Sequence, residues 1–286
     1  MESTMVSAAA SRRRPGPDDR HGPEGGPAEE GRAANSVGKT CAILRALAAR
    51  SPLRLTEVAA ATGLHKVTAL RIMETLIEEG FAEREAEGRG FVRGREFLAL
   101  AAAAARPADI RALARPSLVR LAQLSEDTVL LSVRSGVESV CIDREIGPFP
   151  IRANYLDIGS RRPLGIGAGS LAILSALPDR EVAAILDGSA ERLAEYPGLP
   201  AATVRALVEE TRARGFVLLL DRVVERMGAV GIAVLDEAGR VVAALSIAAL
   251  SERILDRADV LAAALRREAD LIRRDHSGIG RGEVAA

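Results

Sequence analysis

A polar helical face between residues 66 and 75 is the part of this chain best suited to recognise another molecule. Its side chains can donate to phosphates, contact base edges or pack on a thymine methyl group. They are Lys66, Val67, Thr68, Arg71 and Thr75. An apolar stripe runs along the opposite side at near-helical spacing, through Leu64, Ala69, Ile72, Leu76 and Ile77. The pattern predicts a recognition helix that presents its polar face to duplex DNA.

A shorter helix precedes this one and ends in a tight turn. Thr56 is expected to cap it, with Glu57 in the first turn, where a carboxylate suits the helix dipole. Ala59 permits a close helix crossing, and Gly63 permits the left-handed backbone of a turn. The pair predicts a helix-turn-helix, although an αα-hairpin without a DNA role has the same pattern.

The segments on either side extend the motif. Ser36–Arg50 is expected to form a helix with Val37, Cys41, Leu44, Leu47 and Ala48 on one side. After the second helix, Phe81–Glu85 and Gly90–Arg93 read as strands around a glycine turn, and we interpret them as a basic hairpin. This order is that of a winged helix-turn-helix. The predicted DNA contacts are Thr56, Lys66, Val67, Thr68, Arg71, Thr75, Arg84 and Arg89.

Composition narrows the classes of function. The 286 residues include 39 Lys plus Arg and 39 Asp plus Glu, so any DNA contact must come from locally placed cations. There is no Trp, and Phe and Tyr number only five and two, which disfavours a single-strand binder that stacks bases on aromatic rings. At this length the chain is expected to form two domains, each with its own core.

Metal, cofactor and membrane roles are not indicated. Cys41 and Cys141 lie far apart in apolar runs and are expected to be buried thiols, and three histidines occur without ligand spacing. No apolar run reaches the roughly 18 residues of a membrane span. Residues 1–34 are rich in Pro, Gly and mixed charge and predict a disordered tail. We therefore expect a cytoplasmic protein with no cofactor.

Beyond the hairpin, an alanine-rich helix over 96–107 is expected to link two domains. A helix over 108–124 with Pro116 inside it follows, and then strand-like segments at 127–134, 138–143 and 149–154. Helices are expected at 167–177, 179–186 and 201–214, the last ended by Gly215. Strands at 216–220, 229–235 and 240–247 precede a closing helix at 256–274. This is an α+β layout similar to GAF and PAS sensor domains.

A glycine-rich segment from Arg161 to Ser170 opens one of these helices. Glycines let a ligand approach the backbone, and the first N–H groups of a helix favour an anion. A small carboxylate is the natural guest, although the same glycines suit a sharp strand-to-helix turn without any ligand. The phosphate-loop pattern GxxxxGK[ST] is absent.

Longer runs of the sequence resemble one family. SVGKTCAILRALA, LRLTEVAAATGLHKVTALRIMETLIEEGF, GSRRPLGIGAGSLAILSALPDREVAAIL and LDEAGRVVAALSIAALSERI are similar, in that order, to segments of the IclR family of bacterial transcription regulators. The resemblance spans residues 35 to about 276. It implies a winged helix-turn-helix domain at 35–95, a linker helix at 96–107, an effector-binding domain at 108–276 and a flexible tail at 277–286.

The resemblance also implies effector contacts. The family's glycine-alanine pair at a helix start falls on Gly167 and Ala168, and its serine falls on Ser246. A small position falls near Ala229, and an acidic position falls near Asp221. The segment MGAVGIAVLD lacks the family's proline, and Gly169-Ser170 stands where the family often has Gly-Lys. Leu218, Leu219 and Leu220 beside Asp221 suggest an apolar pocket for an aromatic or medium-sized acid.

Three classes of function are therefore compared. The leading hypothesis is a transcription regulator controlled by a small organic acid, which binds duplex DNA as a homodimer or a tetramer because one recognition helix reads too few base pairs. An enzyme acting on a small acid is a second class, but the C-terminal half offers no nucleophile–base pair. A winged-helix adaptor that binds only protein is the third, and the exposed Thr68 and Arg71 argue against it.

Overall fold

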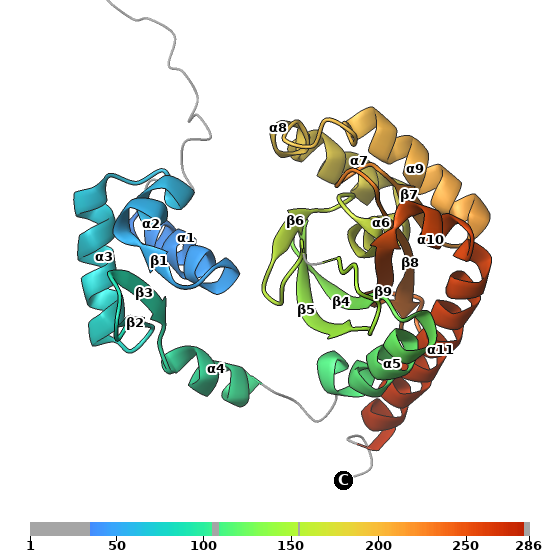
Figure 1. Ribbon diagram of the computed structural model, residues 1–286, viewed down its shortest axis with the longest axis horizontal. Helices are drawn as coiled ribbons and strands as arrows, with labels where there is room; N and C mark the ends of the chain where they lie inside the picture. The colour runs from blue at the N-terminus through green and yellow to red at the C-terminus, as the bar shows by residue number, and fades with distance from the viewer. Residues whose placement is uncertain (1–34, 105–108, 154, 283–286) are drawn as a thin grey trace, which may run out of the picture.

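The computed structural model describes residues 35–104, 109–153 and 155–282 (Figure 1). Its N-terminal part contains helices α1 (Ser36–Ala49), α2 (Leu55–Thr62) and α3 (Lys66–Glu78), followed by α4 (Glu96–Ala104). A small sheet accompanies them, made of β1 (Leu53–Arg54), β2 (Ala82–Arg84) and β3 (Gly90–Arg93). The helix-turn-helix and the two strands after it are thus present as expected.

The first helix of the helix-turn-helix is capped two residues earlier than the sequence predicts. Arg54 holds the N-cap position of α2, and its N–H donates to the carboxylate of Glu57 over 2.7 Å. The expected cap at Thr56 is therefore wrong, because Thr56 lies inside the first turn with its side chain exposed. Gly63 ends α2 at φ 66°, the left-handed conformation predicted for the turn. His65 then occupies the N-cap position of α3.

A compact core joins the three helices and the small sheet. It includes Ile43 and Leu47 of α1, Val58 of α2, and Ala69, Met73 and Leu76 of α3. The apolar stripe predicted for α3 is confirmed in position, with Met73 added to it. The face predicted for α1 is partly wrong, since Val37 is 68% exposed while Ile43 is fully buried.

The wing has three strands rather than two, in the order β1-β3-β2. Leu53 pairs with Phe91, so the chain before α2 closes the open edge of the hairpin. The interpretation of the hairpin as basic is wrong. Its three arginines, at 84, 89 and 93, are matched by three glutamates at 83, 85 and 87, so the hairpin carries no net charge.

The expected linker helix is described only in part. Helix α4 runs from Glu96 to Ala104, and the last residues assigned to the linker, 105–107, lie outside the described part of the chain. The predicted tail at 1–34 also lies outside it. Within α4, Leu98 and Leu100 are exposed to solvent.

The C-terminal part is an α+β unit around one antiparallel sheet, as expected. The strand order is β6-β5-β4-β9-β8-β7. The strands are β4 (Thr128–Ser135), β5 (Glu138–Ile146), β6 (Arg161–Pro163), β7 (Val217–Leu220), β8 (Met227–Leu235) and β9 (Val241–Leu250). The helices are α5 (Ile110–Ser125), α6 (Ala168–Ser175), α7 (Asp179–Gly188), α8 (Ala190–Leu193), α9 (Ala201–Arg214), α10 (Ser251–Leu255) and α11 (Ala258–Gly282).

The period of two along each strand divides the sheet into two faces. On β9, Leu245 and Ile247 pack with α5 and α11, whereas Ala244, the residue before Leu245, joins the core of α6, α7 and α9. Figure 1 shows α5 and α11 along one side of the sheet and α6 on the other. Directly beneath α6, strands β4, β8 and β9 carry small or polar residues, namely Ser132, Gly231 and Ser246.

Several expected boundaries shift. Residues 149–153 form no strand, because the chain there leaves the sheet, and the edge strand β6 comes later, where Glu138 pairs with Pro163. The closing helix α11 continues to Gly282, past the expected boundary at 276. Gly215 ends α9 at φ 80°, as predicted.

An irregularity in β5 changes which side chains face which layer. Leu131 pairs with Asp143 and Ser132 pairs with Cys141, so Ile142 is an extra residue in β5. In a regular strand Cys141 and Asp143 would share a face, but the bulge places them on opposite faces. Asp143 therefore reaches Arg111 and Arg115 of α5 at 3.5 and 3.4 Å, while Cys141 turns toward α6.

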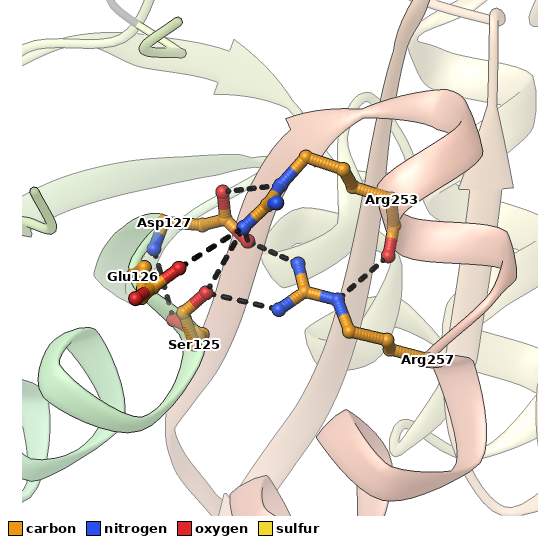
Figure 2. A network of polar contacts seen from close by, with 5 residues as sticks. All are labelled: Ser125, Glu126, Asp127, Arg253 and Arg257. Carbon is orange, nitrogen blue, oxygen red and sulfur yellow. Dashed lines mark hydrogen bonds and ion pairs between the residues drawn. The ribbon is translucent and has the colours of Figure 1, made fainter. Parts of the chain in front are cut away.

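A buried carboxylate fastens the start of the sheet to the C-terminal helices (Figure 2). Asp127 is 1% exposed and accepts hydrogen bonds from Arg253, at 3.3 Å from Nε, and from Arg257. Arg257 also donates to the carbonyl of Ser125 over 3.0 Å. The Arg253 guanidinium lies 3.6 Å from the centre of the Phe149 ring. This cluster ties the end of α5 to α10 and α11.

Candidate functional site

The outer side of α3 presents most of the polar face predicted from the sequence. Lys66, Val67, Arg71 and Thr75 are exposed, and Val67 is 81% exposed, which is unusual for a large apolar side chain. Thr68 is half-buried. The Thr75 hydroxyl donates to the Arg71 carbonyl over 3.3 Å, so it is partly engaged within the helix. The exposed Val67 has the size and place to contact a thymine methyl group.

A shallow groove lies where α2 meets the start of α3. Thr56, Lys66 and Val67, all predicted contacts, line it together with Ala59, Ala60, Leu64 and His65. The groove thus unites residues ten positions apart in the chain. The sequence analysis did not name His65 as a groove residue. Its position between the turn at Gly63 and Lys66 indicates that it lies there.

Two carboxylates limit how α3 can approach a polyanion. Glu74 and Glu78 are exposed on the C-terminal half of the helix. Negative side chains there repel phosphates, whereas Lys66 and Arg71 on the N-terminal half attract them. The charge distribution therefore favours contact through the first two turns of α3.

The remaining predicted contacts lie on the wing. Arg84 and Arg89 are both exposed, and the Arg84 guanidinium stacks 5.3 Å from the centre of the Phe91 ring. This contact holds Arg84 against β3 and leaves its outer edge available. Arg93 is otherwise engaged, because its guanidinium donates to the carbonyl of Ala48 over 3.3 Å.

A second candidate site is a cavity on the α6 face of the large sheet. The space between its walls, open mouth included, is about 610 Å³. Strands β4, β5, β8 and β9, the start of α6 and the segment between β7 and β8 supply its walls. The lining residues are Leu130, Ser132, Ser139, Cys141, Tyr155, Leu156, Ser160, Arg162, Ile166, Gly167, Ala168, Gly169, Ser170, Leu219, Arg222, Val223, Val224, Met227, Gly228, Ala229, Ser246 and Ala248.

The N-terminus of α6 forms part of the cavity wall, through Gly167, Ala168, Gly169 and Ser170. Gly167 holds the N-cap position at φ 90°, a conformation that side chains resist, and it supplies no side-chain cap. The N–H groups of the first helical turn have no partner within a helix. All eight residues of α6 are buried, which strengthens the attraction of this helix end for an anion.

Glycines allow α6 to rest directly on the sheet. A Cβ at Gly231 would lie 2.7 Å from the Ala168 carbonyl oxygen. A Cβ at Gly169 would lie 3.2 Å from the Ser132 hydroxyl and 3.3 Å from that of Ser246. The Ser170 hydroxyl donates to the Pro163 carbonyl and accepts from the Gly165 N–H, at 3.0 and 3.1 Å. These contacts fix the loop that precedes the helix.

The charged groups of the cavity wall are both cations. Arg162 and Arg222 line it, and among the described residues no Asp or Glu does. The Arg162 guanidinium donates to the Tyr155 carbonyl over 3.3 Å and lies 5.4 Å from the Tyr155 ring centre. Sequence analysis placed Arg162 in the glycine-rich segment without a role, and it missed Arg222.

Burial keeps the other titratable groups of the wall neutral. It raises the pKa of Cys141 to about 11, opposed by nearby Arg144, so this thiol is a poor nucleophile at neutral pH. Burial likewise raises the pKa of Tyr155, against the opposing effect of Arg162. Neither group can therefore neutralise the two arginines.

The structure brings four of the five predicted effector residues together. Gly167, Ala168, Ala229 and Ser246 all line the cavity. Asp221 does not line the cavity, so the prediction that it contacts the effector is wrong. Strand β7 ends at Leu220, and at Asp221 the backbone takes φ 58°, which turns the carboxylate outward to accept a hydrogen bond from the Ser251 hydroxyl at 2.8 Å. Of the three leucines before it, only Leu219 lines the cavity.

The described residues offer neither a metal-binding cluster nor a membrane-spanning helix. They hold no group of three or more His, Cys, Asp or Glu side chains placed to bind a metal ion. None of their helices combines the length and apolar character needed to cross a membrane.

Comparison with known proteins identifies both parts of the chain. Residues 36–86 match the IclR helix-turn-helix domain, and residues 102–274 match the family described as bacterial transcriptional regulator IclR C-terminal. The HTH-type transcriptional regulator KipR of Bacillus subtilis is 28% identical over 227 residues, 77% of this chain and 88% of the relative. The glycerol operon regulatory protein of Streptomyces griseus is 29% identical over 78% of this chain and 87% of its own length.

Solved structures show the same fold. An IclR transcriptional regulator from Alicyclobacillus acidocaldarius superimposes with a TM-score of 0.68 at 22% identity, covering 84% of this chain and 97% of that one. An IclR homolog from Microbacterium hydrocarbonoxydans, complexed with 4-hydroxybenzoate, gives a TM-score of 0.68 at 19% identity over 84% and 98%. The resemblance drawn from the sequence is confirmed: the chain belongs to the IclR family of bacterial transcription regulators.

Proposed function

We propose that this regulator binds duplex DNA through α3 and that a small organic acid, bound in the cavity beside α6, changes its affinity for the operator. The observation that carries the proposal is the charge of the cavity, which has two guanidinium groups, a buried helix N-terminus and, within the described residues, no lining carboxylate. Such a site favours an anion. Family membership supports a regulator rather than an enzyme.

The proposed DNA contacts follow from exposure and charge. Lys66 and Arg71 would hold phosphates, and Val67 and Thr68 would read base edges in the major groove. Thr56 stands at the groove beside Lys66, so it suits a phosphate contact. Arg84 and Arg89 of the wing, and Thr75, would complete the interface. Contact centred on the first two turns of α3 would place Thr75 at the edge of the interface and keep Glu78 away from the phosphates.

The proposed assembly is a homodimer, or a pair of dimers, acting in the cytoplasm on a pseudo-palindromic operator. A single recognition helix covers few base pairs, so two related copies are needed for useful specificity. The domains assigned at 35–95 and 108–276, joined by the helix at 96–107, would place one head on each half-site. A footprint without two-fold symmetry would contradict this assembly.

The acid would bind with its carboxylate at the first turn of α6, near Gly167, Ala168 and Arg162. Ser246 would lie below it, and Ala229 would form part of the apolar wall. The structurally similar protein from Microbacterium hydrocarbonoxydans is complexed with a carboxylate, 4-hydroxybenzoate, which makes that acid a sensible first probe.

A thermal-shift screen of aromatic and aliphatic carboxylates, followed by DNA-shift assays with each hit, tests the proposal. An acid at 100 times its Kd should stabilise the protein by about 2.7 kcal/mol. It should change DNA affinity by a coupling of about 1–3 kcal/mol. Ala168→Leu should abolish the response to the acid and spare DNA binding, with Ala190→Leu on the separate helix α8 as a control. A normal response from Ala168→Leu would place the site elsewhere.

A further inference from the structure

Two cations from different elements line one cavity, and its wall supplies no negative charge to balance them. Arg162 comes from β6, ahead of α6, and Arg222 comes from the segment between β7 and β8. Within the described residues, neither guanidinium forms an ion pair with an Asp or Glu side chain. A monocarboxylate can neutralise only one of these charges. The following inference rests on the proposed function, that the cavity binds an organic acid.

Arg162 is held in place but keeps donors to spare. Its hydrogen bond to the Tyr155 carbonyl uses one terminal nitrogen, and the Tyr155 ring lies against the guanidinium. A Cβ added at Gly167 would be 3.4 Å from the other terminal nitrogen, so Arg162 stands directly beside the N-terminus of α6. This helix end and Arg162 therefore form one anion subsite built from both main-chain and side-chain donors.

Arg222 reaches the cavity from its mouth, where the side chain is exposed. Its backbone is packed tightly, because a Cβ at Gly198 would lie only 2.5 Å from the Arg222 carbonyl oxygen. The neighbouring Asp221 cannot neutralise it, since that carboxylate turns away to Ser251. Val223, Val224 and Met227 continue the wall beyond it. Arg222 is thus a second cation with an apolar surface beside it.

We infer that the preferred effector is a dianionic acid, with one carboxylate at the α6 N-terminus and Arg162 and a second carboxylate at Arg222. The carbon skeleton lies on the apolar wall formed by Leu130, Met227, Ala229 and Ala248. The second carboxylate selects among acids that share the first. Arg222 is therefore a specificity-determining residue, and its side chain can change without disturbing the buried subsite.

Matched pairs of acids test this directly. Succinate, glutarate, adipate and terephthalate are each compared with the monomethyl ester by calorimetric titration into the full-length protein at about pH 7.5, where carboxylates are ionised. The best diacid should bind at least about tenfold more tightly than its ester, because a hydrogen-bonded charge pair is lost in the ester. Arg222→Gln should reduce that ratio toward one, because it should weaken binding of the diacid far more than binding of the ester.

Three controls make the result specific. Arg205→Gln removes an equal charge from the exposed surface of α9 and should keep the full ratio. Arg222→Lys retains the charge and should keep part of it. Equal melting temperatures for all the variants would show that they fold alike.

Different failures have different meanings. If ester and diacid bind the wild type equally, or if Arg222→Gln weakens both to the same extent, Arg222 is not a second subsite and the inference is overturned. In that case the proposed acid-binding function still stands. If no acid in either series binds, or if binding leaves DNA affinity unchanged, the proposed function fails and the inference fails with it.

Discussion

Replacing Asp127 with Asn tests the idea that one buried carboxylate fastens the C-terminal helices to the sheet. The side chain is 1% exposed and lies between Arg253 and Arg257, which are 25% and 30% exposed at their own side chains. Asn keeps the shape and removes the charge, so both guanidiniums lose their buried partner. Gly147 and Phe149 also donate main-chain hydrogen bonds to this junction, at Asp127 and Glu126, and these remain.

The expected cost is about 2–3 kcal/mol. Removing one partner of a fully buried pair costs about 3–5 kcal/mol, and hydrogen bonds to charged groups contribute about 1.5–3 kcal/mol each. The partial exposure of both arginines lowers the cost, because water can solvate the guanidiniums that are released. The expected loss of unfolding free energy therefore lies at or just below the lower end of the range for a fully buried pair.

Urea unfolding at neutral pH measures this cost. The chain has no Trp, so far-ultraviolet circular dichroism is the suitable signal. The unfolding midpoint of the C-terminal part should fall by about 1 M. Asp187→Asn, at an exposed pair with Arg205, is the control and should change the stability by less than about 0.5 kcal/mol. An Asp127→Asn midpoint equal to that of the wild type would refute the fastening role.

Three further outcomes are expected. Gly231→Ala should push α6 off the sheet, because the new Cβ would meet the Ala168 carbonyl. It should lower the free energy of unfolding by about 1–3 kcal/mol and weaken acid binding. Gly188→Ala, whose Cβ would meet no neighbouring atom, is the control in the thermal-shift assay. In DNA-shift assays, Arg71→Ala should weaken binding to all DNA sequences, whereas Val67→Ala should change the preference for one base over another by about 1–3 kcal/mol. Unchanged DNA binding by Arg71→Ala would mean that α3 is oriented differently. Burial raises the pKa of Glu138, but hydrogen bonds from Arg161 and Arg192 outweigh burial and leave the pKa below its ordinary 4.5. The ionised carboxylate therefore stabilises the fold above pH 4.5, and this contribution is lost as the pH falls through the folded-state pKa. Glu138→Gln should lower Tm at neutral pH and make Tm fall less steeply in acid than in the wild type, and parallel profiles of Tm against pH would contradict this.

Local backbone chemistry was the part of the fold that could be predicted most directly. Gly63 and Gly215 end helices in the left-handed region because no other residue adopts it as easily, and the sequence shows both. Val37 was misassigned because helical periodicity identifies an apolar stripe but does not show where the partner helices end.

The features that could not be predicted depend on contacts distant in sequence. The extra residue at Ile142 is invisible in the alternation of β5, yet it decides that Cys141 faces the cavity and Asp143 faces α5. Asp221 is two residues after Leu219, which lines the cavity, so regular strand alternation would place both on the same face. The positive φ at Asp221 turns its side chain away instead. Arg162 and Arg222 lie sixty residues apart, and only the folded sheet shows that they share a cavity.

The division of the cavity between main-chain and side-chain donors has a consequence for how such a regulator can evolve. The N–H groups at the start of α6 belong to the main chain, so no substitution other than proline at positions 168–170 removes one, and a change there disturbs a wholly buried helix. Arg222 stands on an exposed segment, where a single codon change alters its charge or reach at little cost to the fold. Under the proposed function, descendants of this gene can therefore retain the anion subsite at α6 while a change at Arg222 alters which acid they recognise.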